Sequence, residues 1–268
     1  MDPWLDVCRA AAADIRAVLQ ELPTRSEREP VLATGVGGDD TTAIDDAAER
    51  AVVRRLEELQ RTGEEFLLVS EELGERAFGD SPTRVVVDPI DGSINAKRGL
   101  RHFCLSIGVA SGAAMGDVSF GYLYDFGTGE EWTATKGGGA QLDGKPLGEV
   151  RPKDKVEILA LEGTLSASVA DKAEALVGYA DRFRIMGSLA LSLCQLAAGR
   201  VDAVCSLRAA RAVDIAAAQL VVRECGLPIA FADAGPWDVA PLNTAPRSLV
   251  VAAPTEELRD RLAEILVM

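Results

Sequence analysis

The segment that decides the interpretation is Val85-Val86-Val87-Asp88-Pro89-Ile90-Asp91-Gly92-Ser93-Ile94-Asn95. Its three β-branched residues predict a buried strand, and the acidic turn that follows places two carboxylates at the end of a sheet. Because Pro89 disfavours helical dihedrals at Asp88, the chain is expected to turn there, so that Asp88, the Ile90 carbonyl and Asp91 converge. Oxygen ligands of this kind suit a hard cation such as Mg²⁺.

Further acids and a helix start are expected close to this turn. Gly92 and Ser93 are expected to open a short helix, whose free N–H groups and positive dipole end would receive a phosphate. Upstream, the apolar run 66–69 ends in Ser70-Glu71-Glu72, which again puts carboxylates at a strand terminus. Asp214 stands at the start of an apolar helix, where a role as N-cap would explain it. Singly, each acid has such an ordinary explanation, but together they would repel one another strongly without cations.

The pattern along the chain predicts two lobes. The N-terminal α+β lobe, residues 1–151, begins with two amphipathic helices and continues into a mixed sheet. The glycine-rich acidic segment 35–42 between these helices is expected to be a mobile loop outside the core. In the C-terminal α/β lobe, residues 152–268, strands alternate with helices. The expected helices are 4–22, 43–61, 167–179, 189–198, 213–224 and 256–266; the expected strands are 66–69, 85–87, 104–110, 118–124, a hairpin over 131–142, 156–161, 183–185, 203–206 and 249–252.

Composition excludes several classes of function. No apolar run approaches the roughly 20 residues that cross a bilayer, and the start Met1-Asp2-Pro3-Trp4 does not resemble a signal peptide, so a soluble cytoplasmic protein is expected. The net charge of −14 disfavours nucleic acid and anionic membranes as partners. The five scattered cysteines lack a CxxC spacing and are interpreted as free buried thiols.

Taken together, the motifs resemble the inositol monophosphatase-like family, which includes inositol monophosphatases, fructose-1,6-bisphosphatases and bisphosphate nucleotidases. The family's pattern Asp-Pro-Ile-Asp-Gly-Ser/Thr is intact at 88–93, with Glu71-Glu72 before it. The downstream Asp followed by small residues is present as Asp214 to Ala217, although Val213 replaces the usual tryptophan. The segments 39–45, 138–144 and 187–188 extend the resemblance over almost the whole chain. The resemblance implies an α/β (α+β) fold of the αβαβα five-layered sandwich type and a homodimer.

Roles for individual residues follow from the resemblance alone. Two to three Mg²⁺ ions are expected per active site, with Mn²⁺ as the alternative metal. The reaction that the resemblance implies is in-line displacement of an alcohol from a phosphate monoester by activated water. Asp45 and Ser93 resemble the dyad that holds and deprotonates this water. The expected metal ligands are Glu71, Asp88, the Ile90 carbonyl, Asp91 and Asp214, with Asp39 or Asp40 for a weaker third ion. Glu71 is also expected to be catalytic. The expected substrate contacts are Gly92, Ser93, Asn95, Gly187, Ser188, Arg208 and Arg211.

The substrate is expected to be a small sugar or inositol phosphate. The acidic residue with which inositol-preferring relatives grip sugar hydroxyls is absent, because the corresponding neighbourhood is Leu207-Arg208-Ala209-Ala210-Arg211. Arg208 or Arg211 could hold a second phosphate, as in the archaeal type that accepts inositol phosphate and fructose-1,6-bisphosphate, or make salt bridges at a dimer interface. The alternatives are a 3′-phosphoadenosine 5′-phosphate phosphatase and a non-catalytic phosphate-binding family member. His102, the sole histidine, lies in no nucleophile motif and is interpreted as structural.

Overall fold

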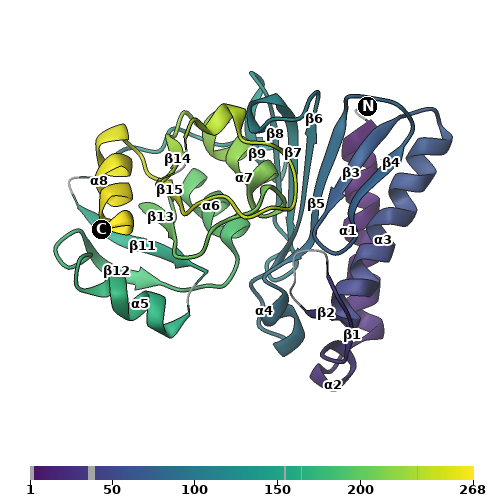
Figure 1. Ribbon diagram of the computed structural model, residues 1–268, viewed down its shortest axis with the longest axis horizontal. Helices are drawn as coiled ribbons and strands as arrows, with labels where there is room; N and C mark the ends of the chain where they lie inside the picture. The colour runs from purple at the N-terminus through teal and green to yellow at the C-terminus, as the bar shows by residue number, and fades with distance from the viewer. Residues whose placement is uncertain (1–2, 36–39, 154, 164, 234) are drawn as a thin grey trace.

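The two larger of three β-sheets are stacked in alternation with three groups of helices in the computed structural model, which describes residues 3–35, 40–153, 155–163, 165–233 and 235–268. The large sheet has the strand order β10-β9-β8-β7-β6-β5-β3-β4 and the small sheet the order β12-β11-β13-β15-β14. Figure 1 shows α1 and α3 outside the large sheet, α6 and α7 between the sheets, and α5 and α8 outside the small sheet. The predicted αβαβα sandwich is therefore confirmed.

Most of the expected helices and strands are present, together with short elements that the pattern did not indicate. The helices are α1 Pro3–Glu21, α2 Arg25–Arg28, α3 Ala43–Arg61, α4 Ser93–Arg98, α5 Ser166–Ala173, α6 Leu189–Ala197, α7 Ala212–Glu224 and α8 Glu256–Val267. The large sheet contains β3 Phe66–Ser70, β4 Gly74–Phe78, β5 Arg84–Asp91, β6 Cys104–Ala110, β7 Val118–Asp125, β8 Glu131–Thr135, β9 Gly139–Leu142 and β10 Lys145–Pro146. The small sheet contains β11 Val156–Glu162, β12 Ala180–Arg184, β13 Ala203–Ser206, β14 Ile229–Phe231 and β15 Val250–Ala252.

The small residues of the middle layer determine where α7 lies. A Cβ on Gly108 of β6 would stand 3.1 Å from the Cβ of Ala216, and one on Gly121 of β7 would stand 2.8 Å from the carbonyl oxygen of Ala217. Only glycines on the sheet opposite alanines on the helix allow so close an approach. The first turn of α7, which carries Asp214, is thereby fixed over the large sheet.

Strand pairing brings two of the predicted acidic turns together. β3 and β5 are parallel neighbours, with Ser70 opposite Val87, so both strands end at the same edge of the sheet. On its other side β5 pairs antiparallel with β6, and the register shifts between Asp88 and Asp91. Such a bulge turns side chains out of the regular alternation of a strand. Glu71, Asp88 and Asp91 therefore leave the sheet in one neighbourhood.

Three predicted elements need correction. The segment 40–42 is not loop: it forms β2 (Asp40–Thr42), which pairs with β1 (Val31–Thr34) and buries Thr41 and Thr42. The helix predicted over 167–179 ends at Ala173, and β12 begins at Ala180 instead of Phe183.

The described helices include none that combines the length and the apolar character needed to span a bilayer.

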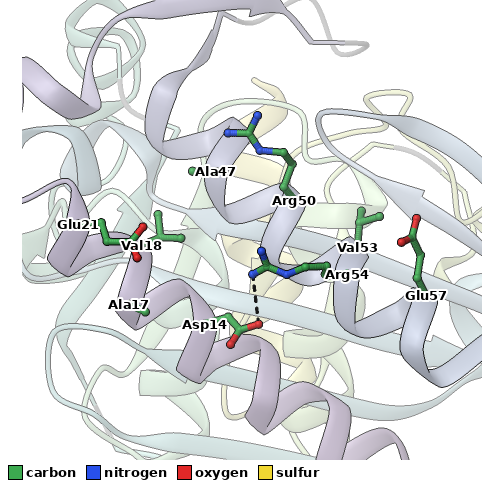
Figure 2. A pocket seen from close by; sticks show the side chains of 9 residues that line it. All are labelled: Asp14, Ala17, Val18, Glu21, Ala47, Arg50, Val53, Arg54 and Glu57. Atoms are coloured by element: carbon green, nitrogen blue, oxygen red, sulfur yellow. Dashed lines mark hydrogen bonds and ion pairs between the residues drawn. The ribbon is translucent and has the colours of Figure 1, made fainter.

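A groove of about 500 Å³ lies between α1 and α3 on the outer helix layer (Figure 2). It contains none of the predicted site residues, and Figure 2 shows that Arg54 and Asp14 face each other across it. Its lining residues are Asp14, Ala17, Val18, Glu21, Ala47, Arg50, Val53, Arg54 and Glu57. Acidic and basic side chains both line it, so it lacks the single sign of charge that would attract a phosphate.

Candidate active site

Three of the predicted metal ligands form one cluster. Glu71 follows β3, Asp88 lies on β5 and Asp214 lies in the first turn of α7, and one carboxylate oxygen from each lies within 4.8 Å of the others. Asp88 is held in place because its Oδ1 accepts a hydrogen bond of 2.9 Å from the main-chain N–H of Ile90. Residues far apart in sequence thus present oxygen ligands to a common point, as a divalent cation requires.

Burial makes two of these acids, Glu71 and Asp88, resist ionisation. Burial and the neighbouring Asp214 raise the pKa of Glu71 to about 7, although Arg211 opposes the shift. Burial, then the charges of Glu71, Asp91 and Asp214, raise the pKa of Asp88 well above its usual range. A cation among them would favour the ionised forms, because it would replace repulsion by attraction.

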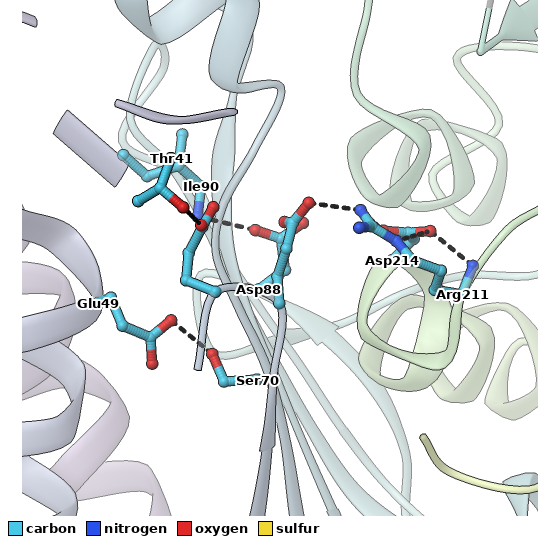
Figure 3. A network of polar contacts seen from close by, with 9 residues as sticks. Thr41, Glu49, Ser70, Asp88, Ile90, Arg211 and Asp214 are labelled. Carbon is cyan, nitrogen blue, oxygen red and sulfur yellow. Dashed lines mark hydrogen bonds and ion pairs between the residues drawn. The ribbon is translucent and has the colours of Figure 1, made fainter. Parts of the chain in front are cut away.

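Arg211 is bound to the same cluster (Figure 3). Its Nη2 donates to Oε1 of Glu71 at 2.5 Å and to Oδ1 of Asp214 at 2.9 Å. Its main-chain N–H, at the N-cap of α7, donates to Oδ2 of Asp214 at 2.6 Å. Asp214 is therefore the third residue of the helix and caps it from within, instead of being the N-cap itself. The Arg211 side chain is only 12% exposed and faces the carboxylates, whereas Arg208 is exposed.

Asp91 lies beside the cluster and is turned towards α6. Its Oδ2 accepts hydrogen bonds from the Ser188 hydroxyl at 2.5 Å and from the Ala190 N–H at 2.8 Å. Burial, only partly offset by the Ser188 bond, raises the pKa of Asp91 to about 7. The start of α6 is thus joined to the end of β5, which brings the predicted substrate residue Ser188 into the site. The role of Asp91 as a metal ligand stays a prediction.

The predicted phosphate-binding turn has the conformation that its glycine implies. Gly92 is left-handed, with φ +95°, and precedes α4 as its N-cap. A Cβ there would lie 3.0 Å from the carbonyl oxygen of Gly187 and 3.1 Å from that of His102. Asn95 is buried, and its Nδ2 donates to the carbonyl oxygens of Met186 at 2.7 Å and His102 at 2.8 Å. The predicted contacts Gly92, Asn95 and Gly187 are therefore neighbours, and Asn95 supports the turn with its side chain.

Asp45 lies in the first turn of α3, where Thr42 holds it. Its Oδ2 accepts from the Thr42 N–H at 3.0 Å and from the Thr42 hydroxyl at 2.5 Å. Burial raises the pKa of Asp45, although the Thr42 bonds and the charge of Lys97 on α4 oppose the shift. Ser93 is the first residue of α4, which packs against α3. The predicted pairing of Asp45 with Ser93 around a water stays a prediction, and Asp39 lies outside the described residues.

Two buried acids support the site and were missed by the sequence reasoning. Glu49 of α3 accepts hydrogen bonds from the Ser70 hydroxyl and the Glu72 N–H, one on each side of Glu71. Burial raises the pKa of Glu49 to about 7, and its Oε1 has no hydrogen-bond partner among the described residues. A signal for it existed, because Glu49 lies beside Ala48 and Val52 on the apolar face of α3.

The second missed acid is Glu162, at the end of β11. It accepts from the Gly187 N–H at 2.8 Å and from the Ser192 hydroxyl at 2.6 Å, and thereby holds the turn before α6. Burial outweighs these donors and raises the pKa of Glu162 to about 7. Its sequence signal was the same as that of Glu71, a carboxylate that directly follows an apolar strand.

The donor set fits a hard divalent cation. It consists of one buried and two half-buried carboxylates from three separate segments of the chain, and it contains neither cysteine nor histidine ligands. Oxygen-only sites of this kind are typical of Mg²⁺, Mn²⁺ and Ca²⁺, whereas Zn²⁺ sites usually include nitrogen or sulfur. The helix start at Gly92 and Ser93 directly follows β5, and its role in binding phosphate stays a prediction.

Comparison with known proteins agrees with this fold. The model of the inositol monophosphatase family matches residues 2–267, and the chain belongs to this family. It is 31% identical to a fructose-1,6-bisphosphatase/inositol-1-monophosphatase of Methanothermobacter thermautotrophicus, over 98% of this chain and 96% of that protein. It is 32% identical to Nus factor SuhB of Pasteurella multocida, over 84% of each chain. A crystal structure described as an inositol monophosphatase–fructose 1,6-bisphosphatase superimposes with a TM-score of 0.84 at 28% identity, covering 98% of this chain and 99% of that one.

Proposed function

We propose that this protein is a magnesium-dependent phosphomonoesterase that hydrolyses inositol-1-phosphate, fructose-1,6-bisphosphate or both. The observation that carries the proposal is the convergence of Glu71, Asp88 and Asp214 within 4.8 Å, beside a glycine-capped helix start. The names of the archaeal relatives, which include both activities, support this choice of substrates.

Glu71, Asp88 and Asp214 would hold the cation, with Asp91 and the Ile90 carbonyl as further ligands. Bound there, Mg²⁺ supplies Lewis-acid polarisation of the phosphoryl group and neutralises charge that develops on the leaving oxygen. The protein's own contribution is to position these groups before reaction. Glu49 fixes the turn that carries Glu71, and the α6 donors fix Asp91. Positioning of this kind and electrostatic stabilisation provide most of the catalysis in phosphoryl transfer.

Phosphate and the attacking water are both assigned to the turn at Gly92 and Ser93. The N–H groups at the start of α4 would bind phosphate oxygens, and the left-handed Gly92 lets the backbone approach them. Asp45, whose pKa is raised by burial, would take a proton from the attacking water together with Ser93. Thr42 holds the Asp45 carboxylate in one orientation for this transfer.

The deciding experiment is a substrate panel with the full chain. Release of inorganic phosphate is measured from inositol-1-phosphate, fructose-1,6-bisphosphate and 3′-phosphoadenosine 5′-phosphate, with Mg²⁺ and with excess chelator. We expect Mg²⁺-dependent release from one or both of the first two, and loss of release in Asp214→Asn. Asp171→Asn, an exposed change on α5, serves as the matched control and should keep full activity.

Two other outcomes would redirect the proposal. Preference for the nucleotide would favour the 3′-phosphoadenosine 5′-phosphate phosphatase. Absence of turnover with all three substrates would contradict the enzyme and favour the non-catalytic phosphate-binding role.

Assembly and location are also proposals. A homodimer rests on analogy with the family and is tested by sedimentation of the purified chain. A cytoplasmic location is supported by five free cysteines, four of them fully buried, since exported proteins usually oxidise such thiols.

A further inference from the structure

We infer that Arg211 is a built-in competitor of the metal ion, which lowers the affinity of the site for Mg²⁺. This inference rests on the proposed function, because it concerns the same carboxylate cluster. Its basis is the position of a single guanidinium nitrogen, Nη2, which lies within hydrogen-bond distance of both Glu71 and Asp214. Those two residues supply two of the three oxygens that converge in the cluster.

The contacts of Asp214 leave little of its carboxylate for another cation. Oδ1 accepts from Nη2 of Arg211 at 2.9 Å, and Oδ2 accepts from the Arg211 main-chain N–H at 2.6 Å and more weakly from Nε at 3.4 Å. Oε1 of Glu71 accepts from the same Nη2 at 2.5 Å. A cation bound by these oxygens would share them with the guanidinium or displace it, and it would be repelled by a like charge close by.

The surroundings strengthen this competition. The Arg211 and Asp214 side chains are 12% and 15% exposed, so water screens their charges little. Burial lowers the pKa of Arg211, but the charges of Asp214 and Glu71 outweigh it and raise that pKa above its usual value. The guanidinium therefore stays charged at any pH at which the enzyme would work. It stabilises the carboxylate cluster by itself, and this stabilisation is lost when a metal takes over the oxygens.

Arg211 can be replaced without removing the helix cap. The hydrogen bond from residue 211 to Oδ2 of Asp214 comes from the main chain, so any residue other than proline retains it. Arg211→Met keeps most of the side chain's volume and removes its charge. Arg211→Lys keeps the charge but loses the planar group that spans two carboxylates. Arg182→Met is the matched control, because Arg182 lies on β12 outside the predicted site, with its side chain 58% exposed and 4.0 Å from Glu157.

The test is calorimetric titration of MgCl₂ into chelator-treated full chain, together with thermal melting in EDTA and in Mg²⁺. We expect Arg211→Met to bind Mg²⁺ about tenfold more tightly than the wild type, a gain of about 1.4 kcal/mol. Its melting temperature should fall in EDTA and should rise by more than that of the wild type when Mg²⁺ is added. Arg211→Lys should lie between the two, and Arg182→Met should match the wild type.

The same titrations distinguish a failure of this inference from a failure of the proposed function. Unchanged or weaker Mg²⁺ binding in both Arg211 variants, beside normal binding in the wild type, would overturn the inference. Weaker binding would show that Arg211 orients the ligands. Absence of Mg²⁺ binding in every variant would overturn the proposed function, and the inference with it. Should Arg211→Met fail to fold, Arg211→Lys decides by the same comparison.

Discussion

Asp88→Asn is expected to stabilise the metal-free protein while it abolishes metal binding. Asp88 is 2% exposed and lies within 4.8 Å of the carboxylate oxygens of Glu71 and Asp214. At an effective dielectric constant of about 20, each ionised pair at that distance costs about 3.5 kcal/mol. Asn removes this repulsion and keeps an oxygen that accepts the Ile90 N–H.

Protonation limits the gain in stability. Because burial raises the pKa of Asp88, the penalty for ionising it is absent below the usual aspartate value of 3.8 and grows as the pH rises. Asp88 can avoid this repulsion if it keeps its proton in the folded state, although an unfolded aspartate with a pKa of 3.8 would lose it. Keeping the proton costs at most about 5.7 kcal/mol at pH 8 and at most about 1.6 kcal/mol at pH 5. Attraction from Arg211 to the Asp88 carboxylate offsets part of this free-energy cost. The expected gain in the free energy of unfolding is therefore about 2 to 5 kcal/mol at pH 8 and less than about 1.6 kcal/mol at pH 5.

Urea unfolding in EDTA at both pH values, repeated at pH 8 with Mg²⁺, measures these differences. The variant should unfold at higher urea than the wild type in EDTA at pH 8, and Mg²⁺ should stabilise only the wild type. A variant that is less stable than the wild type in EDTA at pH 8, or that Mg²⁺ stabilises equally, would refute the electrostatic reasoning.

Three further predictions follow from the site. Asp91→Asn should nearly abolish phosphate release with the circular dichroism spectrum unchanged; near-normal turnover would count against the scheme. Gly92→Ala should lower the free energy of unfolding by at least about 1 kcal/mol more than Gly99→Ala, as measured by urea unfolding. Both glycines have positive φ, but only a Cβ at Gly92 would meet neighbouring atoms. The third change is Glu162→Gln. Burial raises the pKa of Glu162 from 4.5 to about 7 in the folded protein, so the wild type loses stability as the pH rises through this range. Its advantage over this variant should therefore shrink by about 3 kcal/mol between pH 4.5 and pH 8, and a growing advantage would show that the donors around Gly187 stabilise the charged form.

Much of the fold could be predicted because local signals were strong. The helix over 43–61 has the predicted bounds, and the strand before Asp88 was evident from its three valines. The β1–β2 hairpin was missed because Val31–Thr34 is exposed throughout and gives no alternating pattern. The end of the fifth helix was missed for a related reason, since α5 has no fully buried residue to mark its face.

The site was predictable in composition and less so in geometry. The sequence placed carboxylates at strand ends, but only the parallel pairing of β3 with β5 makes Glu71 and Asp88 neighbours. Arg211 shows the limit most clearly. Its pairing with Asp214 follows from a spacing of three residues on a helix, whereas its bond to Glu71 joins residues 140 apart in sequence. Contacts of that kind depend on the packing of α7 against the large sheet.

The most direct measurement is anomalous X-ray scattering from crystals soaked in MnCl₂, with Mn²⁺ standing in for Mg²⁺. If carboxylates from β5, α7 and the end of β3 form a metal centre, a strong peak should lie within bonding distance of Glu71, Asp88 and Asp214. Ordered crystals without a peak there, or with manganese bound only elsewhere on the surface, would contradict it.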